Sequence, residues 1–261
     1  TVSSATYIPE SCTWDMTLND RTISAKLLVA ADGTNSLVRK LQNIPLGFKN
    51  FDQSAIVCNV HISGQHFDIA YERFFNAGVL AMLPFGKRRL KCIWTTPDAR
   101  KDELLAMQDE EFLKCLQQAM GFRLGSMLRV EDRKSFPITY AYADNVYGQS
   151  AVLIGNAANT LHPVAAQGFN LGMRDAITLA EVLRSARLIG APINAVQTLQ
   201  NYAALRAADH QTSRELSNNL VEIFADNKPV TRVLRSFGLV SAQFIPGIKT
   251  KIINAGLGAW M

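Results

Sequence analysis

Two short apolar runs stand out along the chain because each ends abruptly in a turn of small and polar residues. "LLVAAD", the end of a predicted strand "TISAKLLVAAD", stops at Asp32 and Gly33, whereas "SAVLIG" stops at Gly155 and Asn156. Unbroken apolar runs of this length are typical of strands buried on both faces of a parallel sheet. A helical pattern follows each turn, first over "SLVRKLQ" with Ser36 as the candidate N-cap and then over "GFNLGMRDAITLAEVLRSARLIG". The repeated order of strand, turn and helix predicts an α/β fold.

The pattern between these two runs is different, because the apolar residues come in short stretches separated by turn residues. Four strand-like stretches lie between residues 53 and 97, which predicts an antiparallel sheet. Residues 101–121 show the period of one amphipathic helix that ends at Gly121. An extended segment over 135–148 leads to the second apolar run, and residues 194–261 are mostly helical in pattern. The sequence therefore predicts a parallel sheet interrupted by an antiparallel layer.

The distribution of charge changes this picture only at the C-terminal end. The chain carries 27 basic and 22 acidic residues, and the excess of five lies in residues 227–261, which have five basic residues and no acidic one. Within this tail, an apolar stripe runs along the predicted helix at Val230, Val233, Leu234 and Phe237. Such a tail is typical of contact with an anionic membrane surface or a partner, and equally of an ordinary solvated helix. Nucleic acid is disfavoured as a partner, since the tail has no interleaved aromatic residues.

Several other classes of protein are disfavoured by the composition. No apolar run approaches the length of a membrane-spanning helix, and the first residues lack the pattern of a signal peptide. The four cysteines show neither paired spacing nor clustering with histidines, so we expect reduced thiols and no metal site. These features favour a cytoplasmic protein, with peripheral contact at the inner membrane as an extension of the same expectation.

The two turns are the candidate ligand sites. Ligands of open α/β sheets bind outside the carboxyl ends of the strands, where the N-termini of helices direct free N–H groups and a partial positive charge. The second turn suits a flat anionic ligand, because small residues allow close approach before the helix that Gly168 opens. His162 is expected to serve the loop structurally rather than as an acid or base. Trp94, Tyr71 and Phe74 either pack within the sheet or line an aromatic pocket.

Both turns resemble motifs of one family. "AADGTNSLVR" resembles the DG motif of the single-component flavin-dependent aromatic hydroxylases, and "GNAANTLHPVAAQGFNLGMRD" resembles their second FAD motif. "AYERFFNAGVLAMLPF" and the helical tail are similar to the branch of that family that acts in ubiquinone biosynthesis. The resemblance covers nearly all of the 261 residues.

The resemblance implies a fold and its division along the chain. We expect a partial FAD-binding domain of Rossmann-like, parallel-sheet type over residues 1–47, with its second part over 146–190. An antiparallel substrate domain is inserted over 48–145, and a C-terminal helical region follows over 191–261.

The resemblance also implies residues that contact the cofactor. Asp32 and Gly33 would lie near the pyrophosphate and the NADPH path, and Asn156 takes the place of an acidic residue that contacts the ribitol or ribose region. The backbone from Pro163 to Gly168 would lie along the isoalloxazine ring, and the following helix would stabilise negative charge on it. The expected cofactor-binding set is Asp32, Gly33, Arg39, Gly155, Asn156, Pro163, Ala165, Ala166, Gln167, Gly168 and Asn170. No catalytic residue is identified.

The reaction implied by the family is the hydroxylation of a phenol. NADPH reduces bound FAD, O2 adds at the flavin C4a position, and the resulting hydroperoxide transfers oxygen to the ring of a polyprenylated phenol. The implied partners are this lipid substrate, other subunits of a quinone-synthesis complex, a second copy of the chain and a membrane surface.

Three departures from the family pattern limit what the resemblance implies. The family's N-terminal βαβ unit with GxGxxG occurs nowhere in these residues, so the chain is expected to correspond to the C-terminal two-thirds of such an enzyme. Ala166 stands where a glycine is usual, and Asn156 replaces an acidic residue. An alternative reading is a non-catalytic, degenerate hydroxylase that acts as a lipid-binding or assembly subunit.

Overall fold

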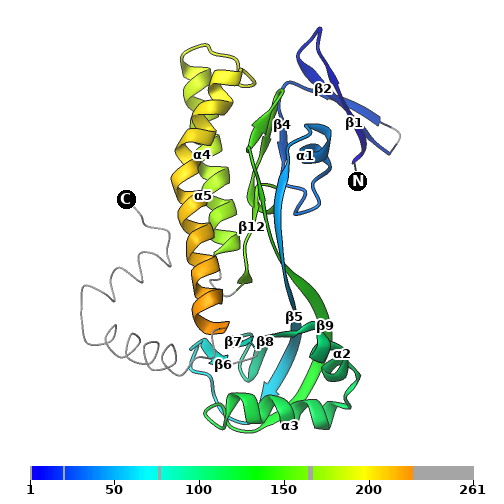
Figure 1. The fold of residues 1–261 in the computed structure, drawn as a ribbon, viewed down its shortest axis with the longest axis vertical. Helices are drawn as coiled ribbons and strands as arrows, with labels where there is room; N and C mark the ends of the chain where they lie inside the picture. Colours follow the sequence, from blue (N-terminus) through cyan, green and yellow to red (C-terminus); the bar gives the residue numbers. More distant parts are fainter. Residues whose placement is uncertain (1, 20, 76–77, 164–166, 226–261) are drawn as a thin grey trace, which may run out of the picture. The chain divides into compact units, whose positions relative to one another are not determined.

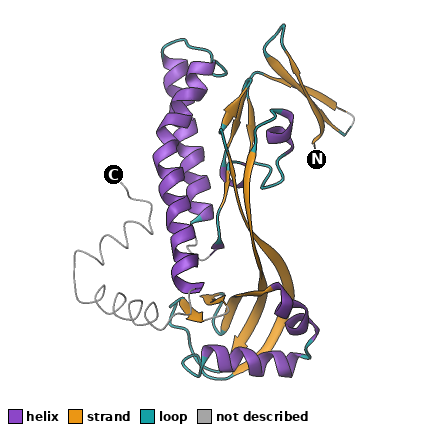
Figure 2. Cartoon of the chain, viewed as in Figure 1, coloured by secondary structure: helices purple, strands orange, loops and turns teal. Residues whose placement is uncertain are grey.

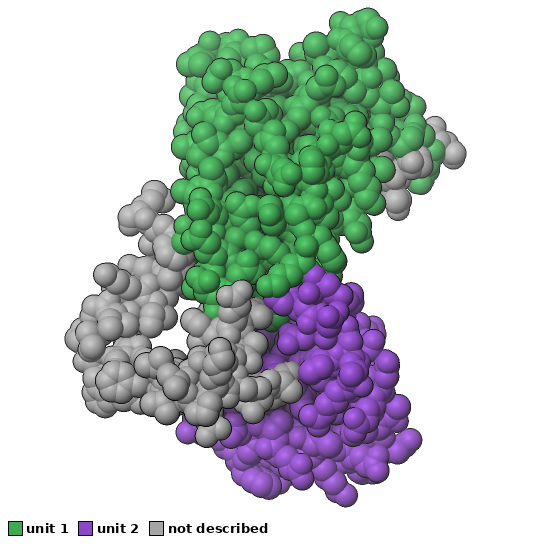
Figure 3. Space-filling view, in the orientation of Figure 1, with its two compact units in different colours: residues 1–49, 139–219, 240–261 green, residues 50–138, 220–239 purple. Residues whose placement is uncertain are grey.

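The computed structural model describes residues 2–19, 21–75, 78–163 and 167–225. The chain divides into two compact units, which are coloured separately in Figure 3. Unit 1 comprises residues 1–49, 139–219 and 240–261, and unit 2 comprises residues 50–138 and 220–239. The predicted four-part division, and the predicted basic tail beyond residue 226, are not tested by the described residues.

The two apolar runs form neighbouring parallel strands in unit 1. β4 (Leu28–Ala30) pairs in parallel with β11 (Ala151–Leu153), and β10 (Tyr147–Gly148) joins β11 on its other side in antiparallel orientation. The three residues of β11 are almost completely buried, as a strand with both faces covered requires. This pairing confirms the predicted parallel sheet.

A second sheet of unit 1 corrects one strand boundary. β1 (Val2–Ile8), β2 (Thr13–Leu18) and β3 (Arg21–Ala25) form an antiparallel sheet of their own. The single strand predicted over residues 22–32 was therefore wrong, because it divides into β3 and β4, which belong to different sheets. A polar interruption at Lys26, between two apolar stretches, lies at this division.

The helices of unit 1 follow the two turns. α1 (Leu37–Leu41) begins after Ser36, whose side chain accepts a hydrogen bond from the backbone N–H of Arg39, as predicted for an N-cap. α4 (Gly168–Leu188) and α5 (Val196–Ala225) run side by side as a long hairpin (Figures 1 and 2). Fully buried Tyr202 joins α5 to the parallel sheet, since its hydroxyl lies 3.3 Å from the carbonyl oxygen of Leu153.

Unit 2 contains most of the predicted antiparallel sheet, whereas β12 and the first residues of β5 and last residues of β9 belong to unit 1. The strands of the large sheet lie in the order β12-β9-β5-β8-β7-β6. Hydrogen bonding is antiparallel between β5 and β8, between β8 and β7, and between β7 and β6. The bounds of these strands are β5 (Leu46–Ile62), β6 (Tyr71–Phe75), β7 (Gly78–Pro84), β8 (Arg89–Pro97), β9 (Met127–Ala143) and β12 (Asn159–Thr160).

The single helix predicted over residues 101–121 was wrong, because the structure has two helices there. α2 (Asp98–Ala106) ends before Met107, and α3 (Asp109–Met120) begins after Gln108. The backbone at Met107 and Gln108 is extended, with ψ angles of 144° and 155°. α3 ends at Gly121, as predicted, with a left-handed φ of 77° that a glycine adopts without strain.

The core of unit 2 forms where α2 and α3 pack on the sheet. Leu104, Phe112 and Leu116 are completely buried against β-strand residues. The ring of Trp94 lies 5.9 Å from that of Phe112, so this tryptophan packs within the core. All four cysteines are free, and none of the described helices is long and apolar enough to span a membrane.

Candidate functional site

In the first turn, after β4, the polar side chains accept hydrogen bonds from the backbone of the helix that follows it. The carboxylate of Asp32 accepts a hydrogen bond of 2.7 Å from the N–H of Leu37, at the start of α1. Gly33 has a left-handed φ of 83°, and a Cβ added there would meet no protein atom within 4 Å. The turn is therefore shaped locally, with open space beside Gly33.

Arg39 lies beneath this turn rather than on its open face. The side chain is 7% exposed, and its Nη1 donates a hydrogen bond of 3.2 Å to the carbonyl of Ile44. The structure thus gives Arg39 a partner within the protein, and its contact with a cofactor stays a prediction.

The second turn, after β11, is a close approach of two backbones. Gly155 has a left-handed φ of 58° and begins a short 3-10 turn, η1 (Gly155–Ala157). A Cβ added at Gly172 of α4 would lie only 3.1 Å from the Cα of Gly155. Asn156 is exposed at the tip of the turn. Glycine is needed at Gly172 for packing, whereas Asn156 is free to face a ligand.

The two turns lie together at one edge of the parallel sheet. The hydroxyl of Thr34 in the first turn lies 2.8 Å from the hydroxyl of Thr160 after the second. Thr160 also donates a hydrogen bond of 3.1 Å to the carbonyl of Asn156. The expectation that both turns share one edge is confirmed.

A buried carboxylate that the sequence analysis did not single out holds the second turn from behind. Asp175 of α4 is completely buried. One of its oxygens accepts a hydrogen bond of 3.0 Å from the N–H of Gly155. The other accepts bonds from Nε of Arg206 at 2.8 Å and from Nε2 of His210 at 2.7 Å, both on α5. The turn, α4 and α5 are thereby joined at one side chain.

A second carboxylate extends this network. Asp209 accepts two hydrogen bonds from Arg174, at 2.7 and 3.0 Å, and its Oδ2 lies 2.6 Å from Nη2 of Arg206. Burial alone would raise the pKa of Asp209, but the hydrogen bonds and charges of the two arginines hold it below its ordinary value. The spacing of Arg206, Asp209 and His210 on one helical face was a signal in the sequence that could have indicated this network.

The start of α4 faces open space. Its N-cap residue, Gln167, is 3% exposed and makes no capping hydrogen bond through its side chain. A Cβ at Gly168 would meet no protein atom within 4 Å, and Phe169 and Asn170 are exposed. Pro163 is also exposed, whereas Ala165 and Ala166 lie outside the described residues. The first turn of α4 contains no acidic residue that would neutralise the positive end of the helix dipole.

His162 is buried within the same loop. His162 is only 3% exposed, and this burial lowers the pKa of its imidazole to about 4. The imidazole is therefore neutral at pH 7. Its burial favours the structural interpretation over a role as an acid or base.

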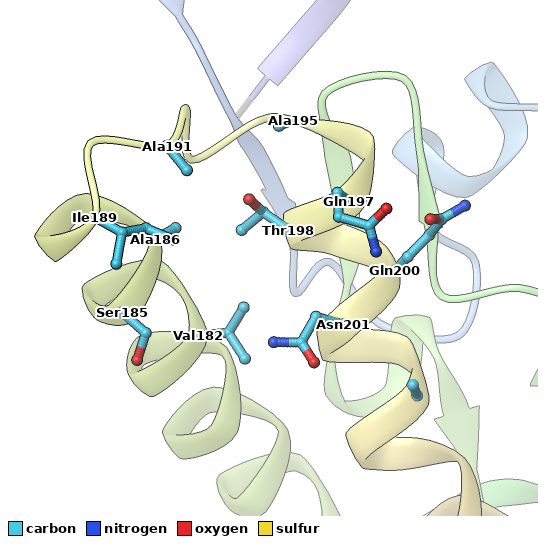
Figure 4. A pocket seen from close by; sticks show the side chains of 11 residues that line it. Val182, Ser185, Ala186, Ile189, Ala191, Ala195, Gln197, Thr198, Gln200 and Asn201 are labelled. Atoms are coloured by element: carbon cyan, nitrogen blue, oxygen red, sulfur yellow. The ribbon is translucent and has the colours of Figure 1, made fainter.

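A hollow of about 550 Å³ lies elsewhere, at the end of α4 opposite Gly168. It is lined by Val182 and Ala186 of α4, by Ile189 just after it, and by residues of α5 that include Thr198 and Asn201 (Figure 4). None of its lining residues carries a charge, so it offers no ionic contact to a phosphate. Among the described residues, no group of three or more His, Cys, Asp or Glu side chains is placed to hold a metal ion.

Comparison with known sequences finds relatives that are named for ubiquinone biosynthesis. The chain is 29% identical to "Ubiquinone biosynthesis monooxygenase COQ6, mitochondrial" of Danio rerio, over 95% of this chain and 58% of that protein. It is 32% identical to "Ubiquinone hydroxylase UbiL" of Rhodospirillum rubrum, over 93% of this chain and 57% of that protein. The chain thus spans somewhat less than three fifths of the length of these relatives.

Solved structures share the fold. The Diels-Alderase PyrE3 of pyrroindomycin biosynthesis matches 98% of this chain and 55% of its own, with a TM-score of 0.77 and 20% identity. PqsL of Pseudomonas aeruginosa, described as a probable FAD-dependent monooxygenase, matches 86% of this chain and 64% of its own, with a TM-score of 0.71 and 22% identity. Because these two proteins are described by different reactions, the fold alone does not fix the chemistry.

The family described as "FAD binding domain" matches residues 13–231, which include both turns and the network behind the second. This match extends over most of the chain, and the chain therefore belongs to the FAD binding domain family.

Proposed function

We propose that this chain is part of a flavin-dependent monooxygenase that hydroxylates a polyprenylated phenol in ubiquinone biosynthesis. The single observation that carries the proposal is the edge formed by the two turns, where a Cβ at Gly168, the first residue of α4, would meet no protein atom within 4 Å. The names of the relatives from Danio rerio and Rhodospirillum rubrum support the substrate class. NADPH as reductant and O2 as oxidant follow from the resemblance to the aromatic hydroxylases.

The residues present fit FAD. An added Cβ would meet no protein atom at either Gly33 or Gly168, so nothing within the described residues fills the space that these two glycines border. The N–H groups and the dipole at the start of α4 suit a ring system that carries negative charge. When bound, FAD would accept electrons from a nicotinamide and activate dioxygen for transfer of one oxygen atom.

The roles of this chain's own residues follow from their positions. The backbone at Gln167 and Gly168 would bind the flavin ring, and the exposed amides of Asn156 and Asn170 would bind its polar substituents. Asp175 would act as a positioning residue, because it holds the N–H of Gly155 from below without facing the open space.

Other members of the predicted set have weaker structural support. Asp32 accepts a hydrogen bond from Leu37, and Nη1 of Arg39 donates one to Ile44, whereas the buried Nε of Arg39 has no partner among the described residues. Pro163, Ala165 and Ala166 are assigned by resemblance alone. Within the branch, "GN" and "LHP" in the second motif resemble 2-polyprenyl-6-methoxyphenol hydroxylase. The proposal does not extend to the ring position that is hydroxylated.

The test is a substitution at Gly168 in the full gene product. Gly168→Val places a branched side chain in the space proposed for the flavin, so we expect flavin content to fall at least tenfold while the fold is retained. Ala180→Val is the matched control, since Ala180 is exposed on the same helix. Flavin absorbance, circular dichroism, NADPH oxidation and mass spectrometry of a prenylated phenol provide the measurements.

Two outcomes contradict the proposal. If Gly168→Val retains normal flavin content and turnover, the start of α4 is not the flavin contact. If the parent gene product contains no flavin and does not oxidise NADPH, the alternative of a lipid-binding or assembly subunit replaces the enzyme.

A further inference from the structure

Three loops meet at one end of the sheet in unit 2, the purple unit of Figure 3. They are residues 63–70 between β5 and β6, residues 85–88 between β7 and β8, and residues 121–126 between α3 and β9. The first loop is bonded to both of the others: a ring nitrogen of His66 lies 2.6 Å from the carbonyl of Gly86, and the N–H of Gly64 donates to the carbonyl of Leu124 at 3.2 Å. We call these three loops together the loop end.

Large apolar side chains are exposed on each loop of the loop end. Phe67 is 73% exposed, Phe85 is 48% exposed and Phe122 is 74% exposed. Ile69, next to Phe67, is 50% exposed. Single exposed apolar residues are ordinary on soluble proteins, but a group on three bonded loops indicates a contact surface.

The backbone around Phe67 is fixed in a conformation that favours this exposure. Phe67 and Asp68 both have left-handed φ angles, of 51° and 56°, which residues with side chains adopt at a cost in free energy. Buried His66 holds the turn, since its Nδ1 accepts a hydrogen bond of 3.0 Å from the N–H of Asp68 while its Nε2 donates to Gly86. Phe67 is therefore held outward by specific contacts rather than by chance.

Basic residues surround these apolar side chains. The three loops contain one acidic residue, Asp68, and three basic ones, Lys87, Arg88 and Arg123. Two further basic residues, Arg89 and Lys91, begin the adjacent strand β8, and Arg89 also donates a hydrogen bond of 3.2 Å to Glu131. The charged groups of Arg89 and Lys91 lie over the ring of Phe85, at 5.2 and 5.3 Å from its centre. Aromatic rings next to cationic groups are typical of surfaces that meet the boundary between water and lipid.

We propose that the loop end docks on an anionic lipid bilayer, with Phe67, Phe85 and Phe122 inserted among the headgroups and the basic residues against lipid phosphates. The charge of the loop end complements an anionic leaflet, whereas a second copy of the chain would bring a like-charged surface against it. This inference rests on the proposed function only for the reason why the protein would meet a membrane, namely that a polyprenylated substrate resides in the bilayer. The evidence for the surface itself is independent of that function.

The experiment is co-sedimentation of the chain with vesicles of phosphatidylcholine, with and without phosphatidylglycerol. We expect binding that requires the anionic lipid and weakens at high salt. The Lys87→Gln and Arg88→Gln double variant should bind at least about tenfold more weakly, since each basic residue near the surface is worth about fivefold. The Phe67→Ser and Phe122→Ser double variant should lose binding to a similar extent.

Matched controls lie in unit 1. Leu188→Ser removes an apolar side chain that is 74% exposed, and Lys26→Gln with Arg184→Gln removes two exposed basic groups. These variants should bind as the parent does. Circular dichroism checks that each variant is folded. As a second readout, Phe67→Trp fluorescence should be quenched by brominated lipid, whereas that of Leu188→Trp should not.

Three results would overturn the proposal. One is a parent chain that binds neither kind of vesicle. Another is undiminished binding by both loop-end variants, which would assign the contact to another surface such as the basic tail. The third is dissociation of a dimer by these variants in the absence of lipid, which would make the loop end an interface between copies. None of these readouts needs flavin or turnover, so failure of the proposed hydroxylase activity is recognised separately.

Discussion

The two turns at the edge of the parallel sheet are built in opposite ways. In the turn after β4, the polar side chains are used within the turn itself, as Asp32 accepts from the N–H of Leu37 and Ser36 accepts from that of Arg39. In the turn after β11, the support comes from a distant element, because the N–H of Gly155 is bound by Asp175 on α4. The first turn is held locally, and the second depends on how two long helices pack.

This difference indicates where the backbone must be placed most accurately. A turn that a buried, charged network holds from behind can keep its outer face free for a ligand, as the exposed Asn156 does. Removing one member of such a network leaves its buried partners without a counter-charge or hydrogen bond. We therefore expect the second turn to be more sensitive to substitution than the first. The predictions below test that asymmetry, from the largest expected effect to the smallest.

The largest effect is expected for Asp175→Ala. The change leaves the buried guanidinium of Arg206 with one carboxylate fewer and frees the N–H of Gly155. Removing one partner from a buried ion pair costs about 3–5 kcal/mol of the free energy of unfolding. Denaturant unfolding followed by circular dichroism measures the loss.

The control for this change is Glu181→Gln, which removes an exposed carboxylate from the same helix. It should alter the free energy of unfolding by less than about 0.5 kcal/mol. If Asp175→Ala were equally harmless, the second turn would not depend on the network behind it.

The sequence predicted the two turns of this site, but it did not predict the buried network of Asp175 that holds the second turn. The apolar runs before Asp32 and Gly155 were enough to predict parallel strands with adjacent turns, because that pattern depends on neighbouring residues. The contacts of Asp175 with Arg206 and His210 join residues that are 31 and 35 positions apart, and they arise only when α4 and α5 pack. The local spacing of Arg206, Asp209 and His210 places them on one face of α5, but it does not identify Asp175 of α4 as their partner.

The next effect concerns the pH dependence of stability. The pKa of His162 is about 4 in the folded chain, against about 6.5 in an unfolded one. Between these values the unfolded state binds a proton that the folded state does not, so the stabilisation is complete above pH 6.5 and is lost as the pH falls to 4. The loss amounts to at most about 3 kcal/mol.

The variant His162→Asn isolates the pH-dependent contribution of His162 to the free energy of unfolding. Its free energy of unfolding should fall less than that of the parent chain between pH 7 and pH 4, measured by urea unfolding at each pH. Substitution of Asn35, an exposed residue of the first turn, by Ala should leave the parent's pH dependence unchanged. Equal slopes in the parent and His162→Asn would contradict the assignment.

A smaller effect is expected from Gly172→Val. The new Cβ would lie 3.1 Å from the Cα of Gly155, so α4 and the turn must move apart. Overpacking of this kind costs about 1–3 kcal/mol. Ala180→Val should change the free energy of unfolding by less than about 1 kcal/mol, because Ala180 is exposed on the same helix. A Gly172→Val variant as stable as this control would show that the close approach is not required.

The break between α2 and α3 shows what the apolar pattern alone misses. Leu104, Phe112, Leu116 and Met120 are buried and recur at helical spacing, so they predicted one continuous helix. Neither glycine nor proline marks the break at Met107 and Gln108. The three acidic residues Asp109, Glu110 and Glu111 were the available signal, since negative charge is favoured in the first turn of a helix.

The smallest effect is expected in the first turn, for Asp32→Ala. The variant loses the hydrogen bond between the carboxylate and the N–H of Leu37, and a lost cap of this kind costs about 1 kcal/mol. Because α1 is short and its cap is local, hydrogen exchange should increase at the start of α1 and stay unchanged at the N–H of Gly155. Asn35→Ala is the control, since Asn35 is exposed in the same turn. Faster exchange at Gly155 in Asp32→Ala would mean that the bond between Thr34 and Thr160 transmits the change, and the two turns would then form one cooperative unit.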